Sequence, residues 1–486
     1  MKTPVFALLL AAYLLLSCRE VSVRAYSDVG RHLTDGALLL SGKSALLHTN
    51  FYSYAQPNAP FVNHHWLASI LFYAASSTLG LSGLNACYVA LGALTFLLYL
   101  NAAETDGGLV TTAALISPML LLMAARPGIR PEIFSVLCLY PFVVVIRQVR
   151  SGTLPFHWVW VLPVIEVVWV NLHPAFILGP LLLAAYLLTD ALARKWDMLR
   201  RWLPLFFVTS LAGLLNPNGL QGLLLPFTVS TNYAMPVREN MPLFLLQDSG
   251  ITWMAEAAVL AFLASTFVAF RRRARLDYGL MLFTAVLAGM NVAFFRVHVF
   301  FGYFALLAIC TNVRAIRTVS NGSPKISPAV AWCVALAALC FSIVVPGAGW
   351  SNFGIGVVKN DDALANFLRD NRISGTVFNG YSSGGYLIYH FPEQKVFIDS
   401  RPEAYPGDFI REEYLEPLAD EAAWLRIQAK YDFEVICFAK FNTDEAQFLG
   451  RRIQDRDWAR VYNGAYQVFV RRQPKFQRLI AEHEVK

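Results

Sequence analysis

The sequence contains little charge: Asp, Glu, Lys and Arg make up only 15% of its 486 residues. Soluble domains carry about 25%, so this scarcity, together with 56% hydrophobic residues, excludes an ordinary soluble protein. Apolar runs of roughly 15–20 residues recur along the first 346 positions, as expected of helices that cross a bilayer. The chain is therefore predicted to be a polytopic α-helical membrane protein.

Several other signatures are absent from the sequence. The seven cysteines are scattered, without CxxC or another metal-ligand spacing, so neither a disulfide framework nor a zinc site is predicted. No basic block carries interleaved aromatic residues, which argues against nucleic-acid binding. The stretch "NGYSSGGYLIYHF" lacks the Gly-Lys-Ser/Thr ending of a phosphate-binding loop, and its glycines are more typical of turns.

The N-terminal stretch "MKTPVFALLLAAYLLLSCRE" has the basic start and apolar centre of a signal peptide, and "LLSC" loosely resembles a lipoprotein cleavage site. Because the chain continues as a polytopic protein, we expect an uncleaved first helix instead. Either outcome leaves residue 20 outside, so the predicted topology does not depend on this choice.

The loops between the apolar runs predict the orientation of the chain. Four loops are richly basic, at 147–152, 194–201, 271–276 and 313–317. Eleven spans with a cytoplasmic N-terminus place all four in the cytoplasm, as the positive-inside rule requires. A twelfth span at 65–77 would invert them, so this stretch is predicted to be a helix in the outer interface. The eleven predicted spans cover about residues 4–18, 84–101, 110–125, 132–148, 156–171, 174–190, 202–216, 253–270, 277–293, 296–312 and 328–346.

This topology leaves several charged residues outside, against the rule. The stretch "RPGIRPE" places Arg126, Arg130 and Glu132 there, and "FFRVH" adds Arg296 and His298. Arginine at membrane depth costs about 2.5–3.5 kcal/mol on insertion scales, so these arginines require another reason. An anionic ligand at the outer face is one; contact with lipid head groups or helix ends is the alternative.

The stretch "EVVWVNLHPAFILG" carries three more polar candidates near the end of a span: Glu166, Asn171 and His173. Glu166 and His173 are seven residues apart and share one face if the helix persists that far. An ionisable residue within a span is a functional candidate, while a structural glutamate bonded to a neighbouring helix is the alternative. His173, in the turn before Pro174, is suited to donate a hydrogen bond to a phosphate oxygen. Gly179 is expected to allow close helix packing.

The first outer loop, residues 19–83, is long. Apolar residues spaced by three or four positions predict an amphipathic helix lying on the membrane, with Val29, Leu33, Ala37 and Leu40 on one face and Asp28, Arg31, His32 and Asp35 on the other. Asp28 is the candidate catalytic residue, because a carboxylate held beside a cavity can act as general base on an incoming hydroxyl. A solvated aspartate near a helix start is the alternative.

Two adjacent histidines, His64 and His65, follow in the same loop as candidates for substrate binding. Together with Asp28 and His32 they offer ligands for a divalent metal. Their spacing is not diagnostic of a metal site, so we expect no metal and name no cofactor.

The order of "SDVGRHLTDGALLLSG", "NFYSY", "NHHWL", "ARPGIRPE" and "WVNLHPAFILG", followed by further spans and an outer C-terminal domain, resembles bacterial integral membrane glycosyltransferases of the GT-C superfamily. The likeness is strongest to proteins similar to dolichyl-phosphate-mannose–protein mannosyltransferases, and it covers most of residues 1–346. It implies horizontal helices in the first outer loop and an acidic residue there as catalytic base, for which Asp28 is the positional match. One departure is Asn50, where related sequences often carry Asp; this puts a second acidic residue in doubt.

From about residue 350 the chain changes character. Residues 1–349 hold 22 Lys and Arg against 13 Asp and Glu, whereas 350–486 hold 18 against 20. Strands are predicted at "GTVFN", "KVFIDS", "FEVICFA" and "YQVFVRR", and helices at "NDDALANFLRDN" and around 409–428, giving an extracytoplasmic α/β domain. Asp399, Arg401, Glu403 and Tyr405 cluster after one strand, either as a site or as structural ion pairs. Acceptor binding or lid duty is the expected role of this domain.

Together these features predict two domains, a multi-span glycosyltransferase-like domain at 1–349 and an α/β domain at 350–486. An outward site has no access to cytosolic nucleotide sugars, so the expected donor is a polyprenyl-phosphate sugar, a hexose or pentose, passed to a glycan, lipid or protein by an inverting displacement. The expected location is the bacterial inner membrane. A lipid-anion transporter or flippase is the alternative, although no convincing internal repeat of the kind common in transporters is visible; a non-catalytic envelope-assembly protein is a third.

Overall fold

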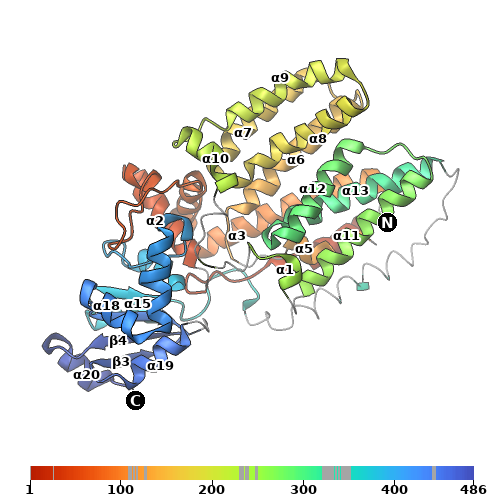
Figure 1. Ribbon diagram of the computed structural model, residues 1–486. Helices are drawn as coiled ribbons and strands as arrows, with labels where there is room; N and C mark the ends of the chain where they lie inside the picture. The colour runs from red at the N-terminus through yellow and green to blue at the C-terminus, as the bar shows by residue number, and fades with distance from the viewer. Residues whose placement is uncertain are drawn as a thin grey trace. The chain divides into compact units, whose positions relative to one another are not determined.

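The computed structural model describes residues 2–25, 27–107, 112, 115–116, 119–124, 128–228, 235, 240–246, 250–319, 333, 336–337, 340, 352–440 and 445–485. The chain divides into two compact units (Figure 1). The first, here the membrane unit, comprises residues 1–20, 83–226 and 236–356; the second, here the α/β unit, comprises 21–82, 227–235 and 357–486. In this division the first outer loop groups with the C-terminal segment, whereas the predicted division at residue 350 grouped it with the membrane helices.

The membrane unit is built of helices that follow the apolar runs of the sequence. Neighbours in the chain pack against one another, notably α6 on α7, α8 on α9 and α12 on α13. The helices are α1 (Lys2–Ser17), α3 (Trp66–Gly107, which begins in the α/β unit), α5 (Leu120–Ala124), α6 (Glu132–Arg150), α7 (Val161–Leu172), α8 (Leu178–Leu192), α9 (Trp196–Ala212), α10 (Gly219–Thr228), α11 (Gly250–Arg271), α12 (Tyr278–Ala293) and α13 (His298–Val319). Short 3-10 turns precede α7 (η3, Phe156–Trp160), α8 (η4, Pro174–Ile177) and α13 (η7, Phe295–Val297).

Five helical segments of the described chain are long and apolar enough to cross a membrane: Trp66–Ala103, Glu132–Arg150, Pro174–Leu192, Ile251–Arg271 and Phe295–Val319. Three shorter apolar helices accompany them, at Val5–Ser17, Phe156–Leu172 and Tyr278–Ala293. The protein is therefore an integral membrane protein, but the predicted count of eleven spans is not confirmed. The predicted run 328–346 lies almost wholly outside the described residues, and 110–125 does so in part.

Gly80 interrupts the long helix α3 with φ 70° and ψ 175°, a conformation that glycine alone adopts without strain. The helical stretch that begins at Trp66 is thereby separated from the part that follows Gly80. This break agrees with the prediction that 65–77 is an element distinct from the span 84–101. The position of this element relative to a membrane stays a prediction.

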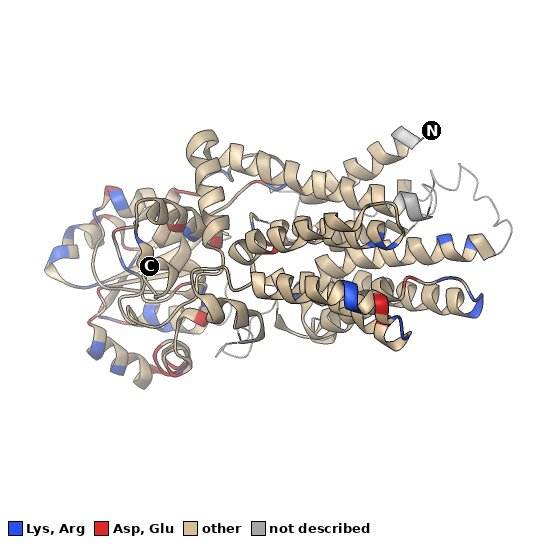
Figure 2. Cartoon of the chain, turned by 90° about the horizontal axis from the view of Figure 1, so that it is seen from above, with Lys and Arg blue, Asp and Glu red and all other residues tan. Residues whose placement is uncertain are grey.

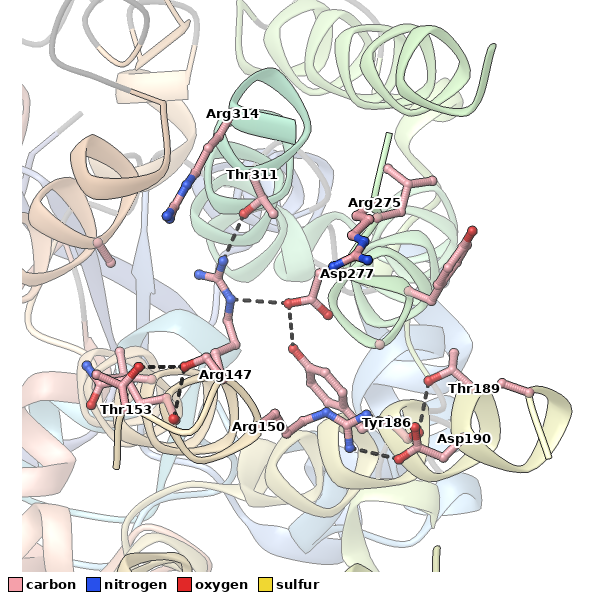
Figure 3. Close-up of a pocket in the computed structure, with 18 of the residues that line it drawn as sticks. Arg147, Arg150, Thr153, Tyr186, Thr189, Asp190, Arg275, Asp277, Thr311 and Arg314 are labelled. Atoms are coloured by element: carbon pink, nitrogen blue, oxygen red, sulfur yellow. Dashed lines mark hydrogen bonds and ion pairs between the residues drawn. The ribbon is translucent and has the colours of Figure 1, made fainter. Parts of the chain in front are cut away.

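The four basic loops lie at one end of the membrane unit. Each contributes a lining residue to the same cavity, namely Arg147, Lys195, Arg275 and Arg314. The bodies of the long helices are almost free of charged residues, and Lys and Arg gather near helix ends (Figure 2). The four loops therefore lie at one end of the membrane unit, around the cavity drawn in Figure 3, and the side of the bilayer on which this end lies stays a prediction.

The opposite ends of the same helices carry the residues predicted to lie outside. Helices α6, α8 and α13 reach the cavity of the basic loops with their last turns, and α12 reaches it with its first turn. Arg130 precedes α6, His173 precedes α8, Arg296 lies between α12 and α13, and His298 is the first residue of α13. These four residues consequently share the other end of the membrane unit.

The α/β unit contains a four-stranded sheet in the order β1-β2-β4-β3, with β1 (Val377–Asn379) parallel to β2 (Val435–Ala439). Strand β4 (Tyr466–Arg471) runs antiparallel to β2 and to β3 (Trp458–Asn463), which the sequence did not predict. The predicted strand "KVFIDS" is wrong: this segment makes only an isolated bridge, Val396 to Ser53. The helices of the unit are α2 (Ser27–Leu40), α15 (Ala363–Asp370), α16 (Gly384–His390), α17 (Glu416–Ala419), α18 (Glu421–Tyr431), α19 (Ala446–Gln454) and α20 (Gln477–His483), with a π-helical turn at Phe409–Leu415.

Candidate functional site

Helix α2 carries the predicted catalytic residue and is enclosed by protein on more than one side. A Cβ added to Gly30 would lie 2.8 Å from the Cβ of Tyr389 in α16, and one added to Gly36 would lie 2.3 Å from the carbonyl oxygen of Ser69. Glycine at these two positions lets backbone and side chains approach α2 closely. The predicted helix is thus present at nearly the predicted residues. The expectation of a one-sided membrane-surface helix is wrong, because its polar face is buried as well.

The polar face of α2 is occupied by a hydrogen-bonded network. Arg31, His32 and Asp35 are 5%, 2% and 0% exposed. The Asp35 carboxylate accepts hydrogen bonds at both oxygens, from Arg31 Nη1 at 3.0 Å and from the Tyr52 hydroxyl at 2.7 Å. Asp35 therefore holds the loop residue Tyr52 against α2, and its predicted supporting role in a site stays a prediction.

Asp28 differs from Asp35 in its exposure. It lies in the first turn of α2 and is only partly buried. The Ser400 hydroxyl donates a hydrogen bond to Asp28 Oδ1 at 2.5 Å, so a residue 372 positions away in the sequence orients the carboxylate. Asp35 is fully buried and engaged at both oxygens, which leaves Asp28 as the carboxylate of α2 that a substrate can reach.

Three histidines of the first loop, His32, His64 and His65, lie together in the same unit. The rings of His32 and His65 meet edge to face at 5.4 Å, and those of His64 and His65 lie 4.0 Å apart. His32 Nδ1 is 2.8 Å from Ser69 Oγ, and Arg31 Nη2 approaches His32 Nε2 at 3.5 Å. Since arginine is only a donor, Nε2 accepts and Nδ1 carries the proton that goes to Ser69.

These contacts do not fit a metal site. Both ring nitrogens of His32 already have hydrogen-bond partners, Ser69 and Arg31. Across the part of the chain that the structure describes, no three His, Cys, Asp or Glu side chains converge as metal ligands. We therefore assign no chemical step to a metal.

A second buried network pins the first loop to the segment that follows residue 398. Arg401 donates to both oxygens of Asp399, at 2.7 and 2.6 Å, and to Asn50 Oδ1 at 2.9 Å. The Tyr405 hydroxyl adds a third hydrogen bond to Asp399 at 2.9 Å, and the Asn50 amide donates to the Ala404 carbonyl at 3.0 Å. Asn50, which stands where related sequences often carry Asp, is thus a hydrogen-bond partner of Arg401. An aspartate at this position would add a negative charge beside the Arg401–Asp399 ion pair.

Burial by itself raises the pKa of the Asp399 carboxyl. The guanidinium of Arg401 beside it and the hydrogen bonds outweigh this effect, so the pKa ends below its ordinary value. Burial also raises the pKa of Glu403, the remaining carboxyl of this predicted cluster. The cluster at 399–405 is therefore an ion pair that shapes the site, which matches the structural alternative considered for it.

The burial of His390, at the end of α16, indicates that the stability of the α/β unit depends on pH. Burial lowers the pKa of His390 to about 4, although Asp362 at 3.5 Å partly offsets the effect. Because the folded state then binds fewer protons than the unfolded chain, stability is complete above about pH 6.5 and falls by up to about 3 kcal/mol as the pH approaches 4. We expect the unfolding temperature of the full chain to fall less over this range in His390→Phe. Equal slopes for both proteins would contradict the prediction.

The end of the membrane unit that carries Arg130 and Arg296 contains an oriented histidine. The Trp169 indole donates to Ser135 Oγ at 2.7 Å, and Ser135 Oγ lies 2.8 Å from His173 Nδ1, which also accepts from the Ala175 amide at 3.2 Å. Nδ1 is thus an acceptor, so the proton of the neutral ring is on Nε2, the donor that the sequence prediction requires. Helix α7 ends at Leu172, so His173 does not extend the helix face of Glu166 as expected.

The other polar residues predicted in this unit differ in burial and in their contacts. Glu166 is fully buried, and its carboxylate oxygens have no hydrogen-bond partner among the described residues. A Cβ added to Gly179 would lie 2.8 Å from Oε2 of Glu166. This distance confirms the close helix packing expected at Gly179. The Asn171 amide donates to the carbonyls of Val167 and Leu215, a structural role. Glu132 and Val299 line one small cavity of about 60 Å³, so the start of α6 lies close to the start of α13.

The remaining predicted phosphate-binding residues of the membrane unit are Arg126, Arg130, Arg296 and His298. His298 is buried, its ring stacks on Phe295 at 4.5 Å, and Nδ1 donates to the Phe295 carbonyl at 2.6 Å. Arg126 lies outside the described residues. Binding of a phosphate by Arg130, Arg296, His298, His64 and His65 stays a prediction.

Sequence reasoning missed Ser400, Tyr52 and Ser69, the neutral partners that orient Asp28, Asp35 and His32. Hydroxyl groups leave little trace in composition or spacing. Only Ser400 carried a signal, because it lies inside the charged cluster that had been noted after residue 398.

The fold of this chain is similar to that of solved structures. No protein-family model and no curated protein sequence matches the chain. Solved structures do match. One match is to an oligosaccharyltransferase from Archaeoglobus fulgidus in complex with zinc and sulfate. The two sequences are 13% identical, the match covers 90% of this chain and 68% of the oligosaccharyltransferase chain, and the TM-score is 0.57. A second match is to ArnT from Cupriavidus metallidurans bound to undecaprenyl phosphate. The two sequences are 12% identical, the match covers 97% of this chain and 98% of the ArnT chain, and the TM-score is 0.52.

Both matches extend over nearly the whole chain, and so include the membrane helices, the first loop and the C-terminal segment. At this level of identity they concern the fold. The chain therefore shares the fold of these two solved structures.

Proposed function

We propose that the protein is a membrane glycosyltransferase that moves a sugar from a polyprenyl-phosphate donor to an extracytoplasmic acceptor. The observation that carries the proposal is the placement of Asp28, a partly exposed carboxylate at the start of α2 whose Oδ1 is held by Ser400. A fixed and accessible carboxylate is what general-base catalysis on a hydroxyl needs. The match to ArnT bound to undecaprenyl phosphate supports a donor of the same lipid class.

The proposed reaction is a single displacement. Asp28 takes the proton of the acceptor hydroxyl while the acceptor oxygen bonds to the anomeric carbon of the sugar. The bond from that carbon to the phosphate oxygen breaks, and the polyprenyl phosphate leaves with the electron pair. Attack from the face opposite the leaving phosphate inverts the configuration at the anomeric carbon.

The leaving phosphate requires hydrogen-bond donors and positive charge. We assign this role to the outer end of the membrane unit, where His173 presents an Nε2 proton and Arg130 and Arg296 supply guanidinium groups. Arginine binds phosphate through paired donors, and preorganised donors stabilise charge that develops in the transition state. We further propose that the protein resides in a bacterial inner membrane and that its C-terminal domain is extracytoplasmic.

A donor-turnover assay tests the proposal. The full chain is reconstituted in nanodiscs with a radiolabelled polyprenyl-phosphate hexose or pentose and a crude envelope acceptor. We expect polyprenyl phosphate to appear in step with labelled acceptor. Gradient-driven movement of an anion without donor consumption would favour a transporter, and failure to turn over any donor would favour a non-catalytic assembly protein.

A further inference from the structure

A partly exposed tyrosine lies beside the proposed catalytic carboxylate. Ser400 makes a hydrogen bond with both residues: its hydroxyl donates to Asp28 Oδ1 at 2.5 Å, and its carbonyl accepts from the Tyr381 hydroxyl at 2.8 Å. The Tyr381 amide also donates to the hydroxyl of the buried Tyr414 at 2.8 Å. Tyr381 is therefore held at its backbone and at its hydroxyl, and its partly exposed ring has a fixed position next to Asp28.

Glu403 presents a second carboxylate on the segment that holds Asp28. It is partly exposed and accepts a hydrogen bond from its own backbone amide. Within the described ranges of the chain, no hydrogen bond or ion pair joins this carboxylate to another residue. Three residues of chain span at most about 11 Å, and the 3-10 turn at Pro402–Ala404 shortens the path from Ser400. One bound molecule can therefore reach Asp28 and Glu403 together.

The carboxylate of Glu403 lies near the polar face of α2. Burial raises the pKa of Glu403, while the hydrogen bond from its own amide and the positive charges of Arg31 and Arg401 lower it. Arg31 lies three positions after Asp28 in α2, so their side chains share a helix face. Arg31 Nη1 donates to Asp35, but the buried Nε has no hydrogen-bond partner among the described residues. This face of α2 therefore keeps an unused donor near the unpaired carboxylate of Glu403.

An aromatic ring next to two accessible carboxylates suits a sugar. The C–H face of a sugar ring packs against a tyrosine, whose ring has an apolar body and a polar tip. The several hydroxyls of a sugar donate to carboxylate oxygens and accept from arginine donors. A serine or threonine side chain offers one hydroxyl and no ring, so it would use Asp28 and leave the other groups idle.

We propose that the acceptor is a sugar, bound with its ring against Tyr381 and with a second hydroxyl donating to Glu403, while Asp28 takes the proton of the reacting hydroxyl. This inference rests on the proposed transferase function and deepens it by naming the acceptor class. Tyr381 and Glu403 set the position of the acceptor, and neither takes part in the proton transfer. The sugar belongs either to a glycan or to the headgroup of a glycolipid, since both present the same hydroxyls.

Kinetics in the donor-turnover assay test the role of Glu403. Glu403→Gln keeps the shape of the side chain but loses the charge that strengthens a hydrogen bond from a hydroxyl. We expect the apparent KM for the envelope acceptor to rise about tenfold, with kcat and the KM for the polyprenyl-phosphate sugar nearly unchanged. Glu412→Gln is the matched control, because Glu412 is exposed, lies in the same segment and pairs only with the exposed Arg411. It should behave like the wild type.

Two variants of Tyr381 test the aromatic contact. Tyr381→Leu removes the ring and should also raise the acceptor KM, whereas Tyr381→Phe keeps the ring and should stay closer to the wild type. Should Tyr381→Leu fail to fold, the result for Glu403→Gln decides. An unchanged acceptor KM in Glu403→Gln, with donor turnover by the wild type intact, would overturn this inference and leave the transferase function standing. Absence of donor turnover in the wild type would remove both.

Fractionation of the labelled product identifies the source of the sugar. Label that is extracted into organic solvent indicates a glycolipid, and label in protease-resistant material that the solvent leaves behind indicates a glycan. Either result supports a sugar acceptor. Label attached directly to serine or threonine, released as a monosaccharide by β-elimination, would overturn the proposal.

Discussion

Replacing Asp28 by asparagine should lower sugar transfer by about 10²–10⁴-fold, the usual contribution of a general base. Asparagine has nearly the same shape, and its amide oxygen still accepts the hydrogen bond from Ser400. It cannot take a proton, so the chemical step alone should suffer. In the donor-turnover assay, kcat should therefore fall while the KM for the polyprenyl-phosphate sugar changes little.

Two comparisons separate a catalytic role of Asp28 from a structural one. Asp370→Asn removes an exposed carboxylate at the end of α15 in the same unit and should leave transfer unchanged. Formate, a small carboxylate, should restore part of the activity of Asp28→Ala, because it can replace the missing base. Transfer at the wild-type rate in Asp28→Asn would remove the base assignment without touching the proposed reaction class.

The helices of the membrane unit were predictable because their signal is local. Apolar runs end at charged or glycine-containing turns, and α6 (Glu132–Arg150) and α12 (Tyr278–Ala293) follow the predicted runs within two residues at each end. The four basic loops, predicted to share one side, line one cavity. The length of an apolar run and the charge of a loop depend only on residues that are neighbours in the chain, so both can be read directly from the sequence.

The composition of the α/β unit was not predictable in the same way. Residues 21–82 group with the C-terminal segment through contacts such as Ser400 to Asp28 and Arg401 to Asn50. These partners lie about 350 or more positions apart, and no spacing rule connects them. For the same reason the polar face of α2 was expected to face an open cavity, although Tyr52 and Ser69 cover it.

Replacing Arg401 by methionine should destabilise the α/β unit by about 3–5 kcal/mol, the usual cost of leaving a buried charge without its partner. Asp399 is fully buried and takes two charged hydrogen bonds from Arg401. The methionine side chain fills similar space but donates nothing, so the carboxylate would be left with the Tyr405 hydroxyl and the backbone amide of residue 401. Asn50 would lose its link to residue 401 at the same time.

Hydrogen exchange on the full chain measures this effect where it arises. Exchange should accelerate in peptides that cover residues 48–55 and 396–410, because local opening becomes easier. Arg411→Met removes an exposed arginine from the same segment, paired only with the exposed Glu412, and should leave both peptides unchanged. Adding Asp399→Leu to Arg401→Met should recover most of the protection, since both buried charges are then gone. If the double variant exchanged as fast as Arg401→Met, the loss would come from the contacts of Arg401 with Asn50 and the ring of Phe61 at 4.6 Å, and the ion pair would not be what holds the first loop in place.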